Sequence, residues 1–127
     1  MKVSRPSISI ALLLMMLFAV TSLHAQSKAG DPVVKVKDRS EKNVNLIWPA
    51  FTGDISQYVL ERSTDARRFQ EVSVVVAMFG SDEPVYEYND RFRSAYAGPL
   101  YYRLRLEGLD GSVVYTPVTI LKALQNK

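Results

Sequence analysis

The chain has 127 residues, with no cysteine and a single histidine, His24. The absence of cysteine excludes disulfides, thiol nucleophiles and thiolate metal ligands. The formal net charge is +3, but Lys2 and Arg5 lie in a segment without acids, so residues 26–127 carry 14 basic and 13 acidic side chains. This near-neutral balance gives no support for a nucleic-acid partner, which requires a basic surface.

The N-terminal segment predicts export. Lys2 and Arg5 precede an apolar run from Ile8 to Val20, which is shorter than the roughly 20 residues that span a bilayer. The following residues, Thr21 to Gln26, complete the three-part layout of a secretory signal peptide with cleavage after Ala25. We therefore expect residues 1–25 to be a signal peptide of the general secretory route, and the mature protein to be periplasmic or extracellular. The alternative is an uncleaved membrane anchor.

Removal of the signal peptide limits the chemistry of the mature chain. We expect membrane contact only through the signal peptide before cleavage, because no cysteine lies near the cleavage site to carry a lipid. His24 leaves with the signal, which excludes histidine-assisted nucleophilic catalysis and histidine metal sites. No cofactor is expected.

Short apolar runs separated by turn residues fill the rest of the chain. Residues 26–31 form a small, polar lead-in that we expect to be flexible. Pro49 ends the second run and Pro117 interrupts the last, because proline donates no ladder hydrogen bond. The turns fall at 38–42, 51–54, 64–68 and 80–84, followed by an irregular stretch to residue 99. The predicted strands cover residues 33–37, 44–48, 55–63, 69–79, 85–88 and the two halves of 100–116, which an Asp110-Gly111 turn joins.

Alternation within these runs predicts the architecture. In the segment 100–108, Tyr102, Leu104 and Leu106 share one face and the residues between them share the other, which is typical of a strand with one buried and one solvated face. Seven such runs in about a hundred residues, with no sustained helical period after the signal, indicate an all-β sandwich. We expect one domain over residues 32–124 and a C-terminal tail at 125–127.

Several of these runs resemble strands of the fibronectin type III family. Leu46-Ile47-Trp48-Pro49 resembles the second strand, ISQYVLER at 55–62 the third, Tyr102 to Leu106 the sixth and Tyr115-Thr116-Pro117 the end of the last. The order of VLERSTD, Phe69, YEYND, YYRLR, DG and YT is similar to fibronectin type III-like domains of exported Bacteroidetes-type bacterial proteins. The resemblance implies a seven-stranded, antiparallel, immunoglobulin-like β-sandwich. The integrin-binding Arg-Gly-Asp motif is absent from the loop at 107–111, so that function is not implied.

The inward faces predict the core. Trp48 could be a platform for a sugar, but it shares a strand face with Leu46 and Val44, and we expect it to pack against Tyr102 and Leu104. By resemblance, the Tyr102 hydroxyl is expected to bond a backbone group near the preceding corner. The predicted core residues are Trp48, Leu46, Tyr58, Leu60, Tyr102, Leu104 and Leu106.

Two surfaces are candidate binding sites. Tyr101, Arg103 and Arg105, with Glu61 on the neighbouring strand, have the composition of a binding hot spot. The alternative is a solvated face on which Glu61 pairs with one arginine. The second candidate is a strand edge that pairs with a partner by β-augmentation, rather than an ordinary sandwich strand. It consists of Val72, Val74, Val75 and Val76.

The carboxylates show no catalytic motif. Asp82 with Glu83, Glu87 with Asp90, and Glu107 with Asp110 are most simply charged turns, although paired acids can cleave glycosides. Calcium binding by Asp82, Glu83 or Asp90 lacks the D-x-D-x-D-G pattern. We therefore expect a non-enzymatic interaction module for a protein partner, in adhesion or envelope assembly. The alternatives are a carbohydrate-binding module using exposed Phe51, Tyr96 or Tyr101, and a protease-inhibitor-like protein.

Overall fold

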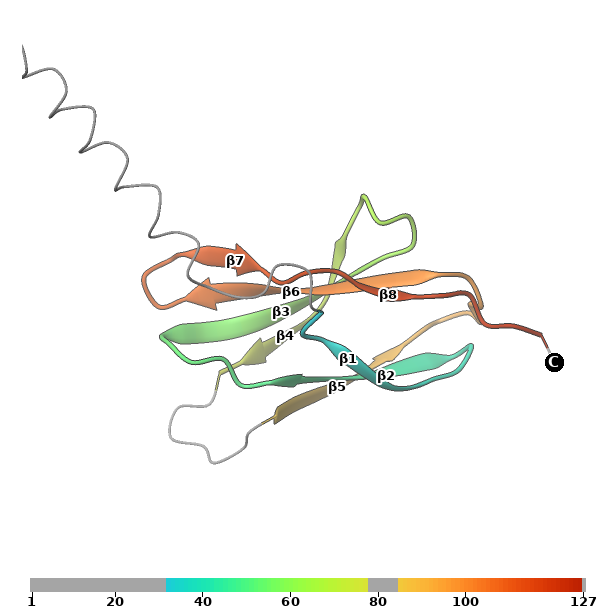
Figure 1. Ribbon diagram of the computed structural model, residues 1–127, viewed down its shortest axis with the longest axis horizontal. Coiled ribbons are helices and arrows are strands. Elements are labelled where there is room, and N and C mark those ends of the chain that lie inside the picture. The colour runs from blue at the N-terminus through green and yellow to red at the C-terminus, as the bar shows by residue number, and fades with distance from the viewer. Residues whose placement is uncertain (1–31, 78–84, 127) are drawn as a thin grey trace, which may run out of the picture.

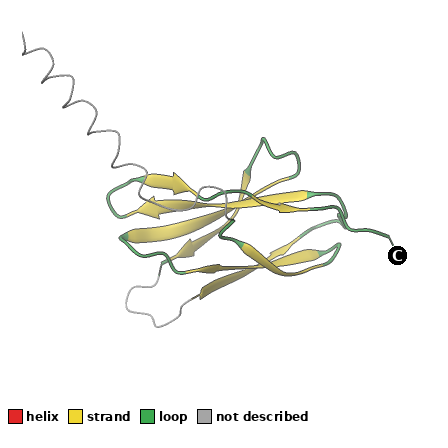
Figure 2. Cartoon of the chain, viewed as in Figure 1, coloured by secondary structure: helices red, strands yellow, loops and turns green. Residues whose placement is uncertain are grey.

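A computed structural model describes residues 32–77 and 85–126, and these residues form two antiparallel β-sheets that pack as two layers (Figures 1 and 2). The three-stranded sheet has the order β1-β2-β5, and the five-stranded sheet has the order β4-β3-β6-β7, with β8 also paired to β6. The bounds are β1 Lys35–Arg39, β2 Asn43–Pro49, β3 Ile55–Ser63, β4 Gln70–Val76, β5 Val85–Arg91, β6 Leu100–Gly108, β7 Val113–Tyr115 and β8 Thr119–Leu121.

The predicted all-β antiparallel sandwich is confirmed, with one difference in its last strand. Pro117 divides that strand, so the described residues contain eight strands where seven were expected. The two pieces pair with different parts of β6: β7 lies opposite residues 105–107 and β8 opposite residues 100–102. The hairpin before β7 turns at Gly111, whose positive φ of 86° suits glycine.

Three strands have a boundary that lies two or more residues from its predicted position. β1 begins and ends two residues later than expected, because Asp38 and Arg39 still pair with Asn45 and Val44 beyond a bulge. β5 continues to Arg91, since its ladder with β2 runs the whole length of that strand. β4 ends at Val76, and the last predicted residues of that run, 78–79, lie outside the described residues. So do the signal peptide 1–25, the lead-in 26–31 and the break at 80–84.

The core lies between the sheets, on alternate residues of β2, β3 and β6. All seven predicted core residues are at most 7% exposed. Trp48 belongs to the same core cluster as Tyr102 and Leu104, and its ring also stacks on Tyr86 at 6.1 Å and meets Tyr58 edge-on at 6.2 Å. Aromatic contacts therefore link β2, β3 and β5. No helix that could cross a membrane occurs in the described part of the chain.

The prediction of a tyrosine corner at Tyr102 is wrong. The buried hydroxyl donates to the Asp90 carboxylate at 2.7 Å instead of to a backbone group. Arg62 donates to both oxygens of the same carboxylate at 2.7 and 2.6 Å. Because β5 extends beyond its predicted end, Asp90 reaches across the sandwich to these side chains from the opposite sheet. Burial, followed by the neighbouring carboxylate, raises the pKa of Tyr102 well above its usual range.

Candidate functional site

The outer face of the five-stranded sheet carries the predicted binding residues. Strand register places side chains in cross-strand rows on this face, and one row holds Val74, Val59, Arg105 and Tyr115. Because opposite residues of an antiparallel pair point to the same side, the neighbouring rows can be read from the same registers. They are Val76, Gln57, Glu107 and Val113; then Glu71, Glu61 and Arg103; then Ser63, Tyr101 and Ile120. We call these four rows the outer face.

Arg103 is held on three sides. Its guanidinium lies 4.0 Å from the ring centroid of Phe69 and 4.2 Å from that of Tyr115. Its Nε donates to the Glu61 carboxylate at 2.7 Å. Cation–π contacts of this kind stabilise a guanidinium without removing it from the surface. Tyr115, which the sequence analysis did not select, is therefore part of the same cluster as the predicted residues.

Arg105 contacts three carboxylates. Its nitrogens lie 2.9 Å from Glu61, 2.5 Å from Glu71 and 3.0 Å from Glu107. The hydrogen bond to Glu71 contributes most to raising the pKa of Arg105. Glu61 is only 5% exposed and contacts both arginines, whereas the solvated-face alternative had it pair with one. We call these four charged residues, together with Arg103, the paired cluster; it lies at the centre of the outer face.

Exposed apolar side chains surround the paired cluster. Val74, Val76, Val113, Tyr115 and Ile120 are each between 48% and 67% exposed. They lie on β4, β7 and β8, at the margins of the sheet. The outer face thus combines a centre of paired charges with an apolar margin.

The predicted partner edge divides between two environments. β4 has one neighbour, β3, and forms an end of the five-stranded sheet. Val74 and Val76 point outward and are exposed, while Val72 and Val75 pack partly buried against the core. Half of the predicted edge residues therefore stabilise the fold directly.

The aromatics considered for sugar binding are not exposed. Phe51 and Tyr96 are partly buried and pack against the core, and Tyr101 is half-buried. The Tyr96 hydroxyl is held by the carbonyl of Pro99 at 2.9 Å. The exposed aromatic side chain of the outer face is Tyr115.

The acidic pairs do not assemble into a catalytic or metal site in the described residues. Asp90 is committed to Arg62 and Tyr102, and Glu107 to Arg105 and Gln57. No cluster of three potential metal-ligating side chains occurs in residues 32–77 and 85–126. Asp82 and Glu83, the other residues considered for calcium binding, lie outside the described residues.

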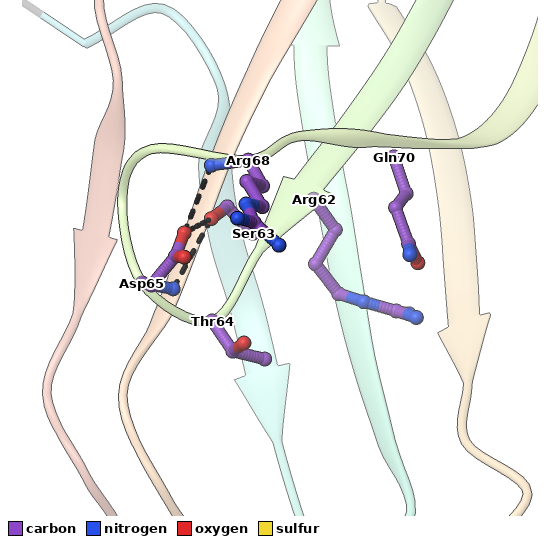
Figure 3. Close-up of a pocket in the computed structure, with 6 residues that line it drawn as sticks. All are labelled: Arg62, Ser63, Thr64, Asp65, Arg68 and Gln70. Carbon is purple, nitrogen blue, oxygen red and sulfur yellow. Dashed lines mark hydrogen bonds between the residues drawn. The ribbon is translucent and has the colours of Figure 1, made fainter.

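A second group of arginines, which the sequence analysis missed, lies where β3 and β5 end. Arg62, Arg67 and Arg68 come from β3 and the loop after it, and Arg91 and Arg93 from the end of β5 and its following loop. In that first loop Asp65 turns back, and its carboxylate accepts the Arg68 amide at 2.9 Å and the Ser63 hydroxyl at 2.9 Å (Figure 3). The available sequence signals were the Arg67-Arg68 pair and the Arg91-Phe92-Arg93 segment.

Comparison with known proteins supports the fold. No family model and no curated protein matches the chain. The sixth fibronectin type III domain of human fibronectin type III domain containing protein 3 is similar in structure, with a TM-score of 0.56, 18% identity and coverage of 81% of this chain and 93% of that domain. Part of a β-1,2-glucanase from Parabacteroides distasonis is also similar, with a TM-score of 0.54 and 18% identity.

The coverage of the two neighbours differs. The match to the glucanase spans 80% of this chain but 13% of the glucanase. At this identity the likenesses concern the fold, not the activity of either neighbour. The immunoglobulin-like class expected from the sequence is confirmed: the described chain has a fibronectin type III-like fold.

Proposed function

We propose that this protein is an exported, non-catalytic interaction module that binds another protein through the outer face of its five-stranded sheet. The observation that carries the proposal is the exposed apolar margin around the paired cluster. An outward-facing strand surface in water is normally polar at alternate positions. Five large apolar side chains at these positions favour a partner that covers them.

The paired cluster contributes preorganisation. Arg103 lies between two aromatic rings and is bonded to Glu61, so little side-chain freedom remains to be lost on binding. Arginine and tyrosine are also the residues enriched at binding hot spots. The fold supports the non-catalytic part of the proposal, because fibronectin type III-like domains commonly serve in binding and because each carboxylate of the cluster is paired with an arginine.

Affinity capture from the envelope of the native host tests the binding face. The double variant Val113→Ser/Tyr115→Ser removes two exposed apolar side chains from the outer face. Val85→Ser/Leu109→Ser is the matched control, since both residues are exposed and lie outside the outer face. We expect one partner to be retained by the wild type and the control and lost by the outer-face variant. Equal retention by both variants would refute this binding surface.

The two remaining parts of the proposal have their own tests. Export predicts that the protein accumulates outside the cytoplasm with Gln26 as its first residue, which N-terminal sequencing checks. Retention of residues 1–25 would contradict cleavage. A hydrolase activity that disappears when a single carboxylate is replaced would contradict the non-catalytic role.

A glycan ligand is the second candidate, and the fold likeness to part of a β-1,2-glucanase indicates which glucan to test first. Tyr115 is the outer-face aromatic with the exposure that stacking on a sugar requires. Retention of the protein on immobilised β-1,2-glucan, lost in Tyr115→Ser, would favour the glycan over the protein partner.

A further inference from the structure

We propose a second binding site, separate from the outer face, where β3 and β5 end, and we assign to it an acidic segment of a polypeptide. Five arginines, Arg62, Arg67, Arg68, Arg91 and Arg93, gather there with two acids, Asp65 and Asp90. These seven residues carry a charge of +3, while residues 26–127 together carry +1. The positive charge of the mature chain is therefore concentrated at this place, which we call the basic end.

Two adjoining hollows give the basic end its shape. One has a volume of about 310 Å³ and is lined by Arg62, Ser63, Thr64, Asp65, Arg68 and Gln70 (Figure 3). The other has a volume of about 390 Å³ and is lined chiefly by Arg62, Arg91, Phe92, Arg93 and Tyr96. Because the hollows share Arg62 and Thr64, a ligand with several anionic groups can occupy both.

The acids of the basic end do not neutralise its outer arginines. Asp90 is buried and pairs with Arg62. The Asp65 carboxylate accepts the backbone amides of Arg68 and Arg67 and the Ser63 hydroxyl, and these hydrogen bonds lower its pKa to about 2. Within the described chain, the side chains of Arg67, Arg91 and Arg93 have no hydrogen bond or ion pair. Three exposed guanidiniums therefore remain available to a ligand.

The loops that present these arginines are held by specific contacts. Asp65 fixes the loop after β3 through the two amides just described. The loop after β5 is fixed by the amides of Phe92 and Tyr96, which donate to the carbonyls of Lys42 and Glu41, each at 2.8 Å. Loops fixed in this way lose less conformational entropy when a ligand binds.

The lining chemistry favours a polypeptide over a sugar. A guanidinium presents a planar fork of donors that matches a carboxylate in two hydrogen bonds. The aromatic rings of the second hollow do not offer an open stacking face: both are half-buried, and Phe92 packs edge-on to Tyr96 at 6.4 Å and lies 5.2 Å from the Arg62 guanidinium. Aspartate and glutamate side chains of an extended segment supply carboxylates for the guanidiniums and need no open aromatic face.

The test measures binding of a labelled peptide of ten glutamates to the protein purified from its exporting host. The variant Arg91→Glu/Arg93→Glu reverses two exposed charges whose side chains make no hydrogen bond or ion pair in the described chain. Lys35→Glu/Lys37→Glu makes the same charge change on β1 and is the matched control. We expect the arginine variant to bind the peptide about tenfold or more weakly, which is the equivalent of one strong charge-assisted contact. The affinity of the lysine control should stay within about threefold of the wild type, because its charges are distant from the site and screened by salt.

Three results would overturn the assignment. The first is absence of binding to the glutamate peptide at low salt, or binding no tighter than to a glutamine peptide of equal length. The second is an equal loss in the lysine control, which would indicate attraction to overall charge. The third is tighter binding of polygalacturonate or of inorganic phosphate, which would indicate a different anion. The outer-face variant Val113→Ser/Tyr115→Ser should bind the peptide normally, so failure of the proposed function leaves this test intact.

Discussion

Replacement of Asp90 by alanine should destabilise the protein strongly, because this carboxylate links the two sheets through polar contacts inside the sandwich. Asp90 is 2% exposed and lies on β5. It accepts the hydroxyl of Tyr102 and both hydrogen bonds of Arg62. Asp90→Ala removes all three bonds at once and leaves the buried hydroxyl and the partly buried guanidinium without their acceptor.

The magnitude follows from what each partner loses. Breaking a buried ion pair by removing one member costs about 3–5 kcal/mol. The Arg62 side chain is 26% exposed and can recover some hydration, so we expect the lower part of that range, about 3 kcal/mol. Tyr102→Phe leaves the ion pair in place and removes one hydrogen bond to a charged group, which is worth about 1.5–3 kcal/mol. In a domain of about 100 residues, the Asp90→Ala loss corresponds to a fall in Tm of about 12–24 °C.

Chemical denaturation of the two single variants and the double variant measures these values. The double variant should cost less than the sum of the single variants, because both remove the same hydroxyl–carboxylate bond. A loss below about 1 kcal/mol for Asp90→Ala would refute the reasoning, because that is the size of an ordinary solvent-exposed pair. A Tyr102→Phe loss clearly larger than that of Asp90→Ala would contradict the contribution of Arg62.

Three further outcomes are expected. Trp48→Ala should cost about 3–5 kcal/mol in denaturant unfolding, since the 1%-exposed ring contacts Tyr58 and Tyr86; a loss near zero would place the ring outside the core. Arg105→Gln should lower the free energy of unfolding by about 2 kcal/mol, because three glutamates lose their shared donor. The control Arg93→Gln, at an unpaired arginine, should leave the free energy of unfolding unchanged, and equal losses in the two variants would contradict the paired cluster. The Asp65 carboxylate should titrate near pH 2 in carbon-detected NMR. Because its folded pKa lies below the unfolded value, the stability it provides is present above about pH 4 and lost as the pH falls towards 2, and a midpoint near 4 would contradict the loop geometry.

Strand alternation was enough to predict the fold class and the buried residues. Trp48, Leu46 and the inward residues of β6 lie at alternate positions of their strands, and the structure buries all of them. This pattern depends on local geometry, since successive side chains of a strand point to opposite faces whatever lies on the other sheet.

Contacts between distant residues could not be predicted in the same way. The partner of the Tyr102 hydroxyl is Asp90, which lies on the opposite sheet beyond the predicted end of its strand. Glu61 contacts both arginines because the register of β3 on β6 places Glu61 opposite Arg103 and next to Arg105. Register is a property of paired strands, and a single strand does not carry it. For the same reason the outward half of the 100–108 strand is part of the fold as well as a candidate site.

The basic end could not be predicted from the overall charge, because a near-neutral sum does not say how the charges are distributed over the surface. The paired cluster has three glutamates and two arginines and is net negative, whereas the basic end carries +3. We expect the difference in charge between these two places to direct the proposed acidic segment towards the basic end and away from the outer face. A partner of the outer face must instead bury the apolar margin and accept a negative centre. We therefore expect the two proposed surfaces to select ligands of different chemistry, so that substitutions that abolish binding at one leave the other occupied.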